Sequence, residues 1–203
     1  MVWSVYVTHP QVHIDRDVAV PEWGLSDIGR RRAEAFAGRD LLPRHAVFIS
    51  SRERKARELA AILGQRHGNR IETRHEFGEN DRSSTGFLDP SAFEKQVDLL
   101  FGYPDQSANG WETAIDAQSR IVGAVRAALA QFGERPLVFV GHGCVGTLLK
   151  CHVGGRAIAR QEDQREAADP GGGNIFGFDL AAHSLLCDWT AMEIWQGFDH
   201  GGG

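Results

Sequence analysis

The chain has 203 residues, 42% of them hydrophobic, and a formal net charge of −5, which is typical of a globular protein with a sizeable core. The negative charge argues against binding to nucleic acid or to an anionic membrane surface. The three cysteines form no CxxC pair, which predicts neither a disulfide framework nor a zinc site. Because no apolar run is long enough to cross a bilayer or resembles a signal peptide, we expect a cytoplasmic protein.

Hydrophobic periodicity predicts strands and helices that alternate along the chain. Strands are expected at residues 2–7, 46–49, 71–73, 136–140, 174–179 and 185–195. Helices are expected at residues 26–38, 53–66, 91–101, 112–132 and 143–153, with Ser26 and Ser51 as capping residues of the first two. We expect a polar loop at residues 76–90 and a mobile, charged surface loop at 154–173. This order predicts one α/β domain over residues 1–203, with a mostly parallel sheet between two layers of helices.

Two histidines follow directly after predicted strands, one early in the chain and one late. His9 follows the first strand, and His142 lies in a Gly-His-Gly turn between a strand and a helix. In a largely parallel sheet, ligands bind where strands end. A helix N-terminus also presents free backbone N–H groups that can hold an anion. The pattern therefore predicts an oxyanion site that contains both imidazoles.

Five segments, in this order, are similar to the motifs of a known family. They are Thr8-His9-Pro10, Leu25-Ser-Asp-Ile-Gly29, Ser50-Ser-Arg-Glu-Arg-Lys-Ala56, Phe77-Gly-Glu79 and Gly141-His142-Gly143. Together they resemble the histidine phosphatase superfamily, which has a phosphoglycerate mutase-like, three-layer α/β/α fold. The resemblance covers nearly the whole chain, and the ordered set is more specific than any one motif.

The resemblance implies a role for each of three residues in the hydrolysis of phosphate monoesters. His9 corresponds to the nucleophile that forms a phosphohistidine, and His142 to the histidine that holds phosphoryl oxygens. Glu79 corresponds to the acid that protonates the leaving group, although Glu76 and Asp81 are close in sequence. The expected partner is a small phosphorylated molecule. No metal or other cofactor is expected where cationic side chains supply the positive charge.

The sequence departs from the family pattern in the residues expected to bind phosphate. Thr8 stands where the family has an arginine, Pro10 where it has a glycine, and Lys55 where it has a second arginine. Threonine carries no charge, and lysine is a point charge without the bidentate geometry of a guanidinium. We expect Thr8, Lys55 and Gly143 to lie at the phosphate, with Arg82 as the replacement cation. Other candidates for that cation are Arg16, Arg52, Arg54 and His13.

Three other functions remain compatible with the sequence. The altered motif could belong to a phospho-ligand-binding module of the same fold with little or no turnover. A phosphomutase is a second alternative. The third is a dinucleotide-binding oxidoreductase, because Gly141-His-Gly-Cys-Val-Gly146 satisfies GxGxxG after a strand and Glu162 lies near the expected position of a ribose-binding acid.

Overall fold

The computed structural model describes residues 4–198, which form six strands, six α-helices and three short 3-10 helices. The strands are β1 (Ser4–Thr8), β2 (Val47–Ser51), β3 (Ile71–Arg74), β4 (Leu137–Gly141), β5 (Asn174–Asp179) and β6 (Ser184–Ala191). The α-helices are α1 (Asp27–Gly38), α2 (Arg54–Gln65), α3 (Pro90–Gly102), α4 (Ala114–Phe132), α5 (Gly143–Val153) and α6 (Gln164–Ala167). The 3-10 helices are η1 (Val20–Glu22), η2 (His75–Phe77) and η3 (Arg160–Glu162).

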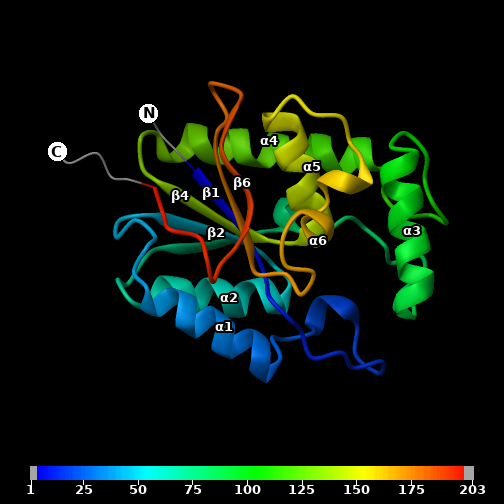
Figure 1. Cartoon of the computed structure of the whole chain (residues 1–203), viewed down its shortest axis with the longest axis horizontal. Helices are drawn as coiled ribbons and strands as arrows, with labels where there is room; N and C mark the ends of the chain where they lie inside the picture. The colour runs from blue at the N-terminus through cyan, green and yellow to red at the C-terminus, as the bar shows by residue number, and fades with distance from the viewer. Residues whose placement is uncertain (1–3, 199–203) are drawn as a thin grey trace.

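The strands form one sheet in the order β3-β2-β4-β1-β5-β6. β1, β2, β3 and β4 pair in parallel, whereas β5 and β6 pair antiparallel to their neighbours. Helices α1 and α2 cover one face, and α4 and α5 cover the other (Figure 1). The predicted mostly parallel three-layer α/β/α architecture is therefore confirmed.

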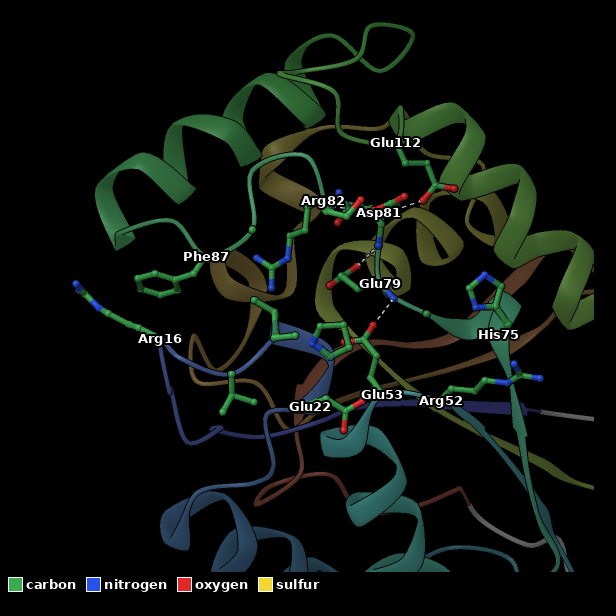
Figure 2. A pocket seen from close by; sticks show the side chains of 18 of the residues that line it. Arg16, Glu22, Arg52, Glu53, His75, Glu79, Asp81, Arg82, Phe87 and Glu112 are labelled. Atoms are coloured by element: carbon green, nitrogen blue, oxygen red, sulfur yellow. Dashed lines mark hydrogen bonds between the residues drawn. The ribbon is translucent and has the colours of Figure 1, made fainter.

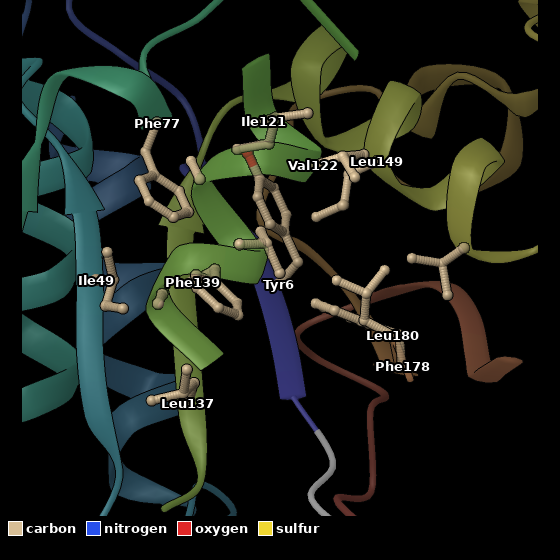
Figure 3. Close-up of a cluster of buried hydrophobic side chains, with 14 of the residues drawn as sticks. Tyr6, Ile49, Phe77, Ile121, Val122, Leu137, Phe139, Leu149, Phe178 and Leu180 are labelled. Carbon is tan, nitrogen blue, oxygen red and sulfur yellow. The ribbon is translucent and has the colours of Figure 1, made fainter. Parts of the chain in front are cut away.

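Aromatic side chains fill the space between the sheet and helices α4 and α5. Tyr6 and Phe139 project from the central strands toward this layer, where Phe77 stacks on Phe139 at a centroid distance of 5.4 Å (Figure 3). A second cluster of mostly aliphatic side chains lies between the other face of the sheet and helices α1 and α2. Because both faces are covered, all five residues of β1 and of β4 are buried, as expected for central parallel strands.

Most elements agree with the sequence predictions, and α5 agrees at both ends. The hydroxyl of Ser26 caps α1 by accepting a hydrogen bond from the Gly29 N–H at 3.1 Å, as predicted. Ser51, however, is the last residue of β2 and does not cap α2, so that prediction was wrong. The last strand ends at Ala191, earlier than predicted, because the chain turns there. The first two residues of the predicted first strand lie outside the described residues.

The expectation of a mobile surface loop at residues 154–173 is only partly correct. This segment contains η3 and α6, and it buries Asp163 and Gln164 against the rest of the molecule. Gln164 is 7% exposed and contacts the end of β1 through its side-chain amide. The charged composition of this segment predicted an exposed loop, but part of the segment packs beside the strand ends.

The register of the central strands brings the two histidines together. Thr8 of β1 lies opposite Gly141 of β4, and the next N–H, that of His9, donates to the Gly141 carbonyl at 3.1 Å. Parallel neighbours in register end at the same edge of a sheet. Residues far apart in sequence therefore reach one site.

No helix within residues 4–198 is long and apolar enough to span a membrane.

Candidate active site

His9 is a neutral imidazole whose orientation is set by its own turn. Its Nδ1 lies 2.9 Å from the Pro10 carbonyl oxygen, which only accepts hydrogen bonds, so Nδ1 carries the proton. Burial, reinforced by the nearby charge of Lys55, lowers the pKa of His9 from 6.5 to about 4. At neutral pH the other nitrogen, Nε2, therefore has a free lone pair, which is the state a histidine nucleophile requires.

His142 is completely buried directly before α5, and Tyr6 holds its backbone. The Tyr6 hydroxyl accepts from the His142 N–H at 3.1 Å and donates to the His142 carbonyl at 3.3 Å. The imidazole Nε2 lies 2.7 Å from Ser51 Oγ and 3.3 Å from Glu53 Oε1. Burial lowers the pKa of His142 to about 3, so this ring is also neutral. The two imidazoles pack edge to face with a centroid distance of 5.3 Å.

Lys55 lies beside this pair, but another side chain already compensates its charge. Its Nζ donates to Glu53 Oε2 at 2.5 Å and to the Val20 carbonyl at 3.0 Å. The Lys55 side chain is 5% exposed and that of Glu53 is 16% exposed. Although burial opposes it, the charge and hydrogen bond of Lys55 and the Glu79 backbone N–H hold the pKa of Glu53 below its usual range. The cation predicted to face a phosphate therefore forms part of a buried ion pair.

Glu79 caps the N-terminus of α5 with its carboxylate. Oε1 accepts from the Val145 N–H at 2.9 Å, and Oε2 accepts from the Cys144 N–H at 3.2 Å. Burial raises the pKa of Glu79 despite these backbone hydrogen bonds. This helix end thus holds a side chain of the protein itself. The raised pKa favours the protonated carboxyl, which is the form that a general acid requires.

The neighbouring acids occupy different surroundings. Asp81 lies in an exposed loop and accepts a hydrogen bond from the Ser83 N–H at 2.9 Å. This hydrogen bond lowers the pKa of Asp81. Glu76 is also exposed. Neither contacts α5, whereas Glu79 does. The geometry therefore favours Glu79 among the three candidates.

A cavity of about 940 Å³ opens beside these residues (Figure 2). Glu53, Glu79 and Arg82 line this cavity. His9 and His142 do not line it. Arg82 points into the cavity toward Glu79 (Figure 2). The central carbon of its guanidinium lies over the Phe93 ring, 5.0 Å from the ring centroid. Within residues 4–198 no hydrogen bond or ion pair neutralises that guanidinium. Arg82 is therefore a cation that remains available to a ligand.

The other cations considered from the sequence differ in their surroundings. Arg54 pairs with Glu58 at 2.8 Å, and Arg16 pairs with Asp89 at 2.9 Å on the surface. Arg52 lines the cavity but is exposed. Its side chain lies near His75 and away from Arg82 (Figure 2).

Thr8 and Gly143 are both close to Gln164, which belongs to the segment predicted to be a mobile loop. The Thr8 hydroxyl donates to Gln164 Oε1 at 2.7 Å and accepts from the Asn174 N–H at 2.9 Å. A Cβ added at Gly143 would lie 2.3 Å from Gln164 Nε2, so only glycine fits there without displacing the amide. Thr8, which we expected at the position of a family arginine, is thus part of a neutral, buried hydrogen-bond network.

Glu53 and Gln164 are the site residues that sequence reasoning missed. Glu53 lies two residues before Lys55, and nothing in that spacing marks it as a residue of the site. Only the pairing of β2 with β4 places it beside His142. Gln164 is polar in a polar segment, and its burial depends on contacts with β1.

Comparison with known proteins shows the family to which this chain belongs. The chain matches the family model described as histidine phosphatase superfamily (branch 1) over residues 9–179, which is most of its length. The chain belongs to the histidine phosphatase superfamily. No curated protein matches its sequence.

Solved structures of superfamily proteins share the fold. A mycobacterial glucosyl-3-phosphoglycerate phosphatase superposes with a TM-score of 0.71 and 19% identity, covering 87% of this chain and 89% of that one. The same enzyme in complex with inorganic phosphate gives a TM-score of 0.74 at 19% identity, covering 96% and 100%. YhfR of Bacillus stearothermophilus gives 0.74 at 15% identity, covering 91% and 94%. At these identities the likeness concerns the phosphoglycerate mutase-like fold alone.

Gly141, Gly146 and Glu162, which suggested a dinucleotide site, have structural roles here. The two glycines leave room for Tyr6, and Glu162 pairs with a lysine. A Cβ at Gly141 or at Gly146 would lie within 2.5 Å of the Tyr6 ring or hydroxyl, so these glycines accommodate Tyr6. Glu162 accepts from the buried Lys150 at 2.7 Å and belongs to η3, which follows α5 and not a strand. The oxidoreductase alternative therefore loses both of its supporting observations.

Proposed function

We propose that the protein hydrolyses phosphate monoesters of small molecules through a phosphohistidine on His9. Membership in the superfamily supports a phosphatase-like or mutase-like role. The observation that carries the finer proposal is the state of His9, with Nδ1 bonded to the Pro10 carbonyl and a pKa of about 4. Its Nε2 is thereby a nucleophile that needs no general base.

In this mechanism His9 Nε2 attacks phosphorus while the bond to the leaving oxygen breaks. Glu79 donates a proton to that oxygen and becomes a carboxylate, which the Cys144 and Val145 N–H groups stabilise. Water then attacks the phosphohistidine, Glu79 takes up a proton from this water, and the P–N bond breaks to release phosphate. Arg82, which faces the cavity, supplies positive charge to the phosphoryl oxygens.

One set of contacts favours a phospho-ligand-binding module as the second candidate. Lys55 pairs with Glu53, and Thr8 is bound to Gln164, so two positions that carry positive charge in the family offer little to a phosphate here. Phosphoryl transfer depends mainly on such charge. A module of this kind would bind its ligand without turnover.

The experiment that separates the two candidates is incubation with an aryl phosphate between pH 5 and 8. Hydrolysis would give a burst of phenol and an acid-labile phosphoprotein in the wild type, and His9→Ala would abolish both. His45→Ala is the matched control because His45 is an exposed histidine with no role proposed for it. Ligand binding without burst or phosphoprotein in the wild type would refute hydrolysis and support the module.

A further inference from the structure

The Glu53 carboxylate is surrounded by the kinds of donor that would otherwise hold an oxyanion. Lys55 Nζ lies 2.5 Å from Oε2, and the Glu79 backbone N–H donates to Oε1 at 3.0 Å. His142 Nε2 lies 3.3 Å from the same Oε1. An ammonium, an imidazole and a backbone amide thus converge on one carboxylate, a donor set that also suits a phosphate.

The position of Glu53 places this carboxylate between His142 and the cavity. Glu53 lines the 940 Å³ cavity, whereas His142, which it contacts, does not. Figure 2 shows Glu53 directly below Glu79 in the cavity wall. A ligand that enters from the cavity therefore meets Glu53 before it reaches His142.

The surroundings of His142 explain why Glu53 and a phosphate would compete for it. Nε2 lies 2.7 Å from Ser51 Oγ and 3.3 Å from Glu53 Oε1. Nδ1 is buried without a partner in the described part of the chain. While Glu53 stays in place, its carboxylate occupies space beside Nε2 that a phosphoryl oxygen would need.

We propose that the Glu53 carboxylate is an internal competitor for the phosphoryl oxygens, so that a phosphate must displace it to reach Lys55 and His142. This inference rests on the proposed function, because it concerns the same site. Like charges only a few ångströms apart in a partly buried site repel strongly. Glu53 therefore weakens dianion binding both by repulsion and by occupying donors.

The test is the affinity of wild type, Glu53→Gln and Glu22→Gln for inorganic phosphate, measured by calorimetry at pH 7.5. Glu22 is an exposed acid that lines the same cavity, so its substitution controls for the loss of one negative charge. We expect Glu53→Gln to lower the Kd for phosphate by at least about tenfold. Glu22→Gln should change the Kd by less than about twofold, since exposed charges are screened.

Glu53→Asp keeps the argument testable if Glu53→Gln fails to fold without its carboxylate beside Lys55. Aspartate keeps the charge but withdraws it by one methylene, so the Kd should fall by a smaller factor. An unchanged Kd in the folded variants, an equal effect of Glu22→Gln, or no phosphate binding by any form would overturn the proposal. The proposed hydrolysis is tested by a different measurement, the formation of phosphoprotein. Because a Kd for phosphate does not depend on turnover, the two proposals can fail independently.

Discussion

Replacing Tyr6 with phenylalanine tests how the fold holds His142. Tyr6 is fully buried, and its hydroxyl is the acceptor for the His142 N–H at 3.1 Å. The His142 carbonyl has a second partner, since it also accepts from the Gly146 N–H at 3.1 Å. The substitution removes one oxygen and leaves one buried N–H without an acceptor.

The expected cost follows from that single unsatisfied group. A buried donor left without a partner costs about 1–3 kcal/mol in the free energy of unfolding. For a chain of this size each kcal/mol lowers Tm by about 2–4 °C, so Tyr6→Phe should unfold about 2–12 °C below the wild type. Aryl phosphate turnover should fall as well, because the backbone that places the His142 imidazole loses its anchor.

The assay is thermal and urea unfolding followed by circular dichroism, with Tyr103→Phe as the matched control. The chain has two tyrosines, and Tyr103 is 54% exposed, so the control removes the same atom from solvent-facing surface. Tyr103→Phe should unfold within about 1 °C of the wild type. A Tyr6→Phe protein with unchanged Tm and turnover would refute the role assigned to this hydrogen bond.

Three other predictions concern charge at the site. Between pH 6.5 and 4 the unfolded chain binds protons that His9 and His142 in the folded chain do not, so stability toward urea should fall as the pH falls. The fall should be less steep in His9→Asn, which keeps only one of the two histidines. Glu79→Gln should lower kcat about 10²–10⁴-fold for an alkyl phosphate. The loss should be smaller for a nitrophenyl phosphate, because its leaving group needs no proton. Equal losses for the two substrates would exclude the acid role of Glu79. Thr8→Arg should lower stability by roughly 1–3 kcal/mol in urea unfolding, without raising turnover, because Gln164 fills the adjacent space. A gain in turnover would show that the arginine can still be accommodated.

Much of the fold could be predicted because its signals are local. The apolar residues of β1 and β4 form short continuous runs, and the hydroxyl of Ser26 marks the start of α1. The segment 154–173 was predicted less well because its buried residues are polar. Their burial depends on long-range partners, such as Thr8 for Gln164.

The sequence by itself determined the order of strands and helices, the positions of His9 and His142 at strand ends, and the likeness to a family. Each of these follows from periodicity or from residues close together in the chain. Only the tertiary structure decided how the site is charged. Whether Lys55 is free or paired, and whether α5 holds a ligand or Glu79, depends on side chains that β-sheet pairing brings together across the chain. Electrostatic interactions in a buried site depend on distance in space, and the sequence specifies that distance only through the fold.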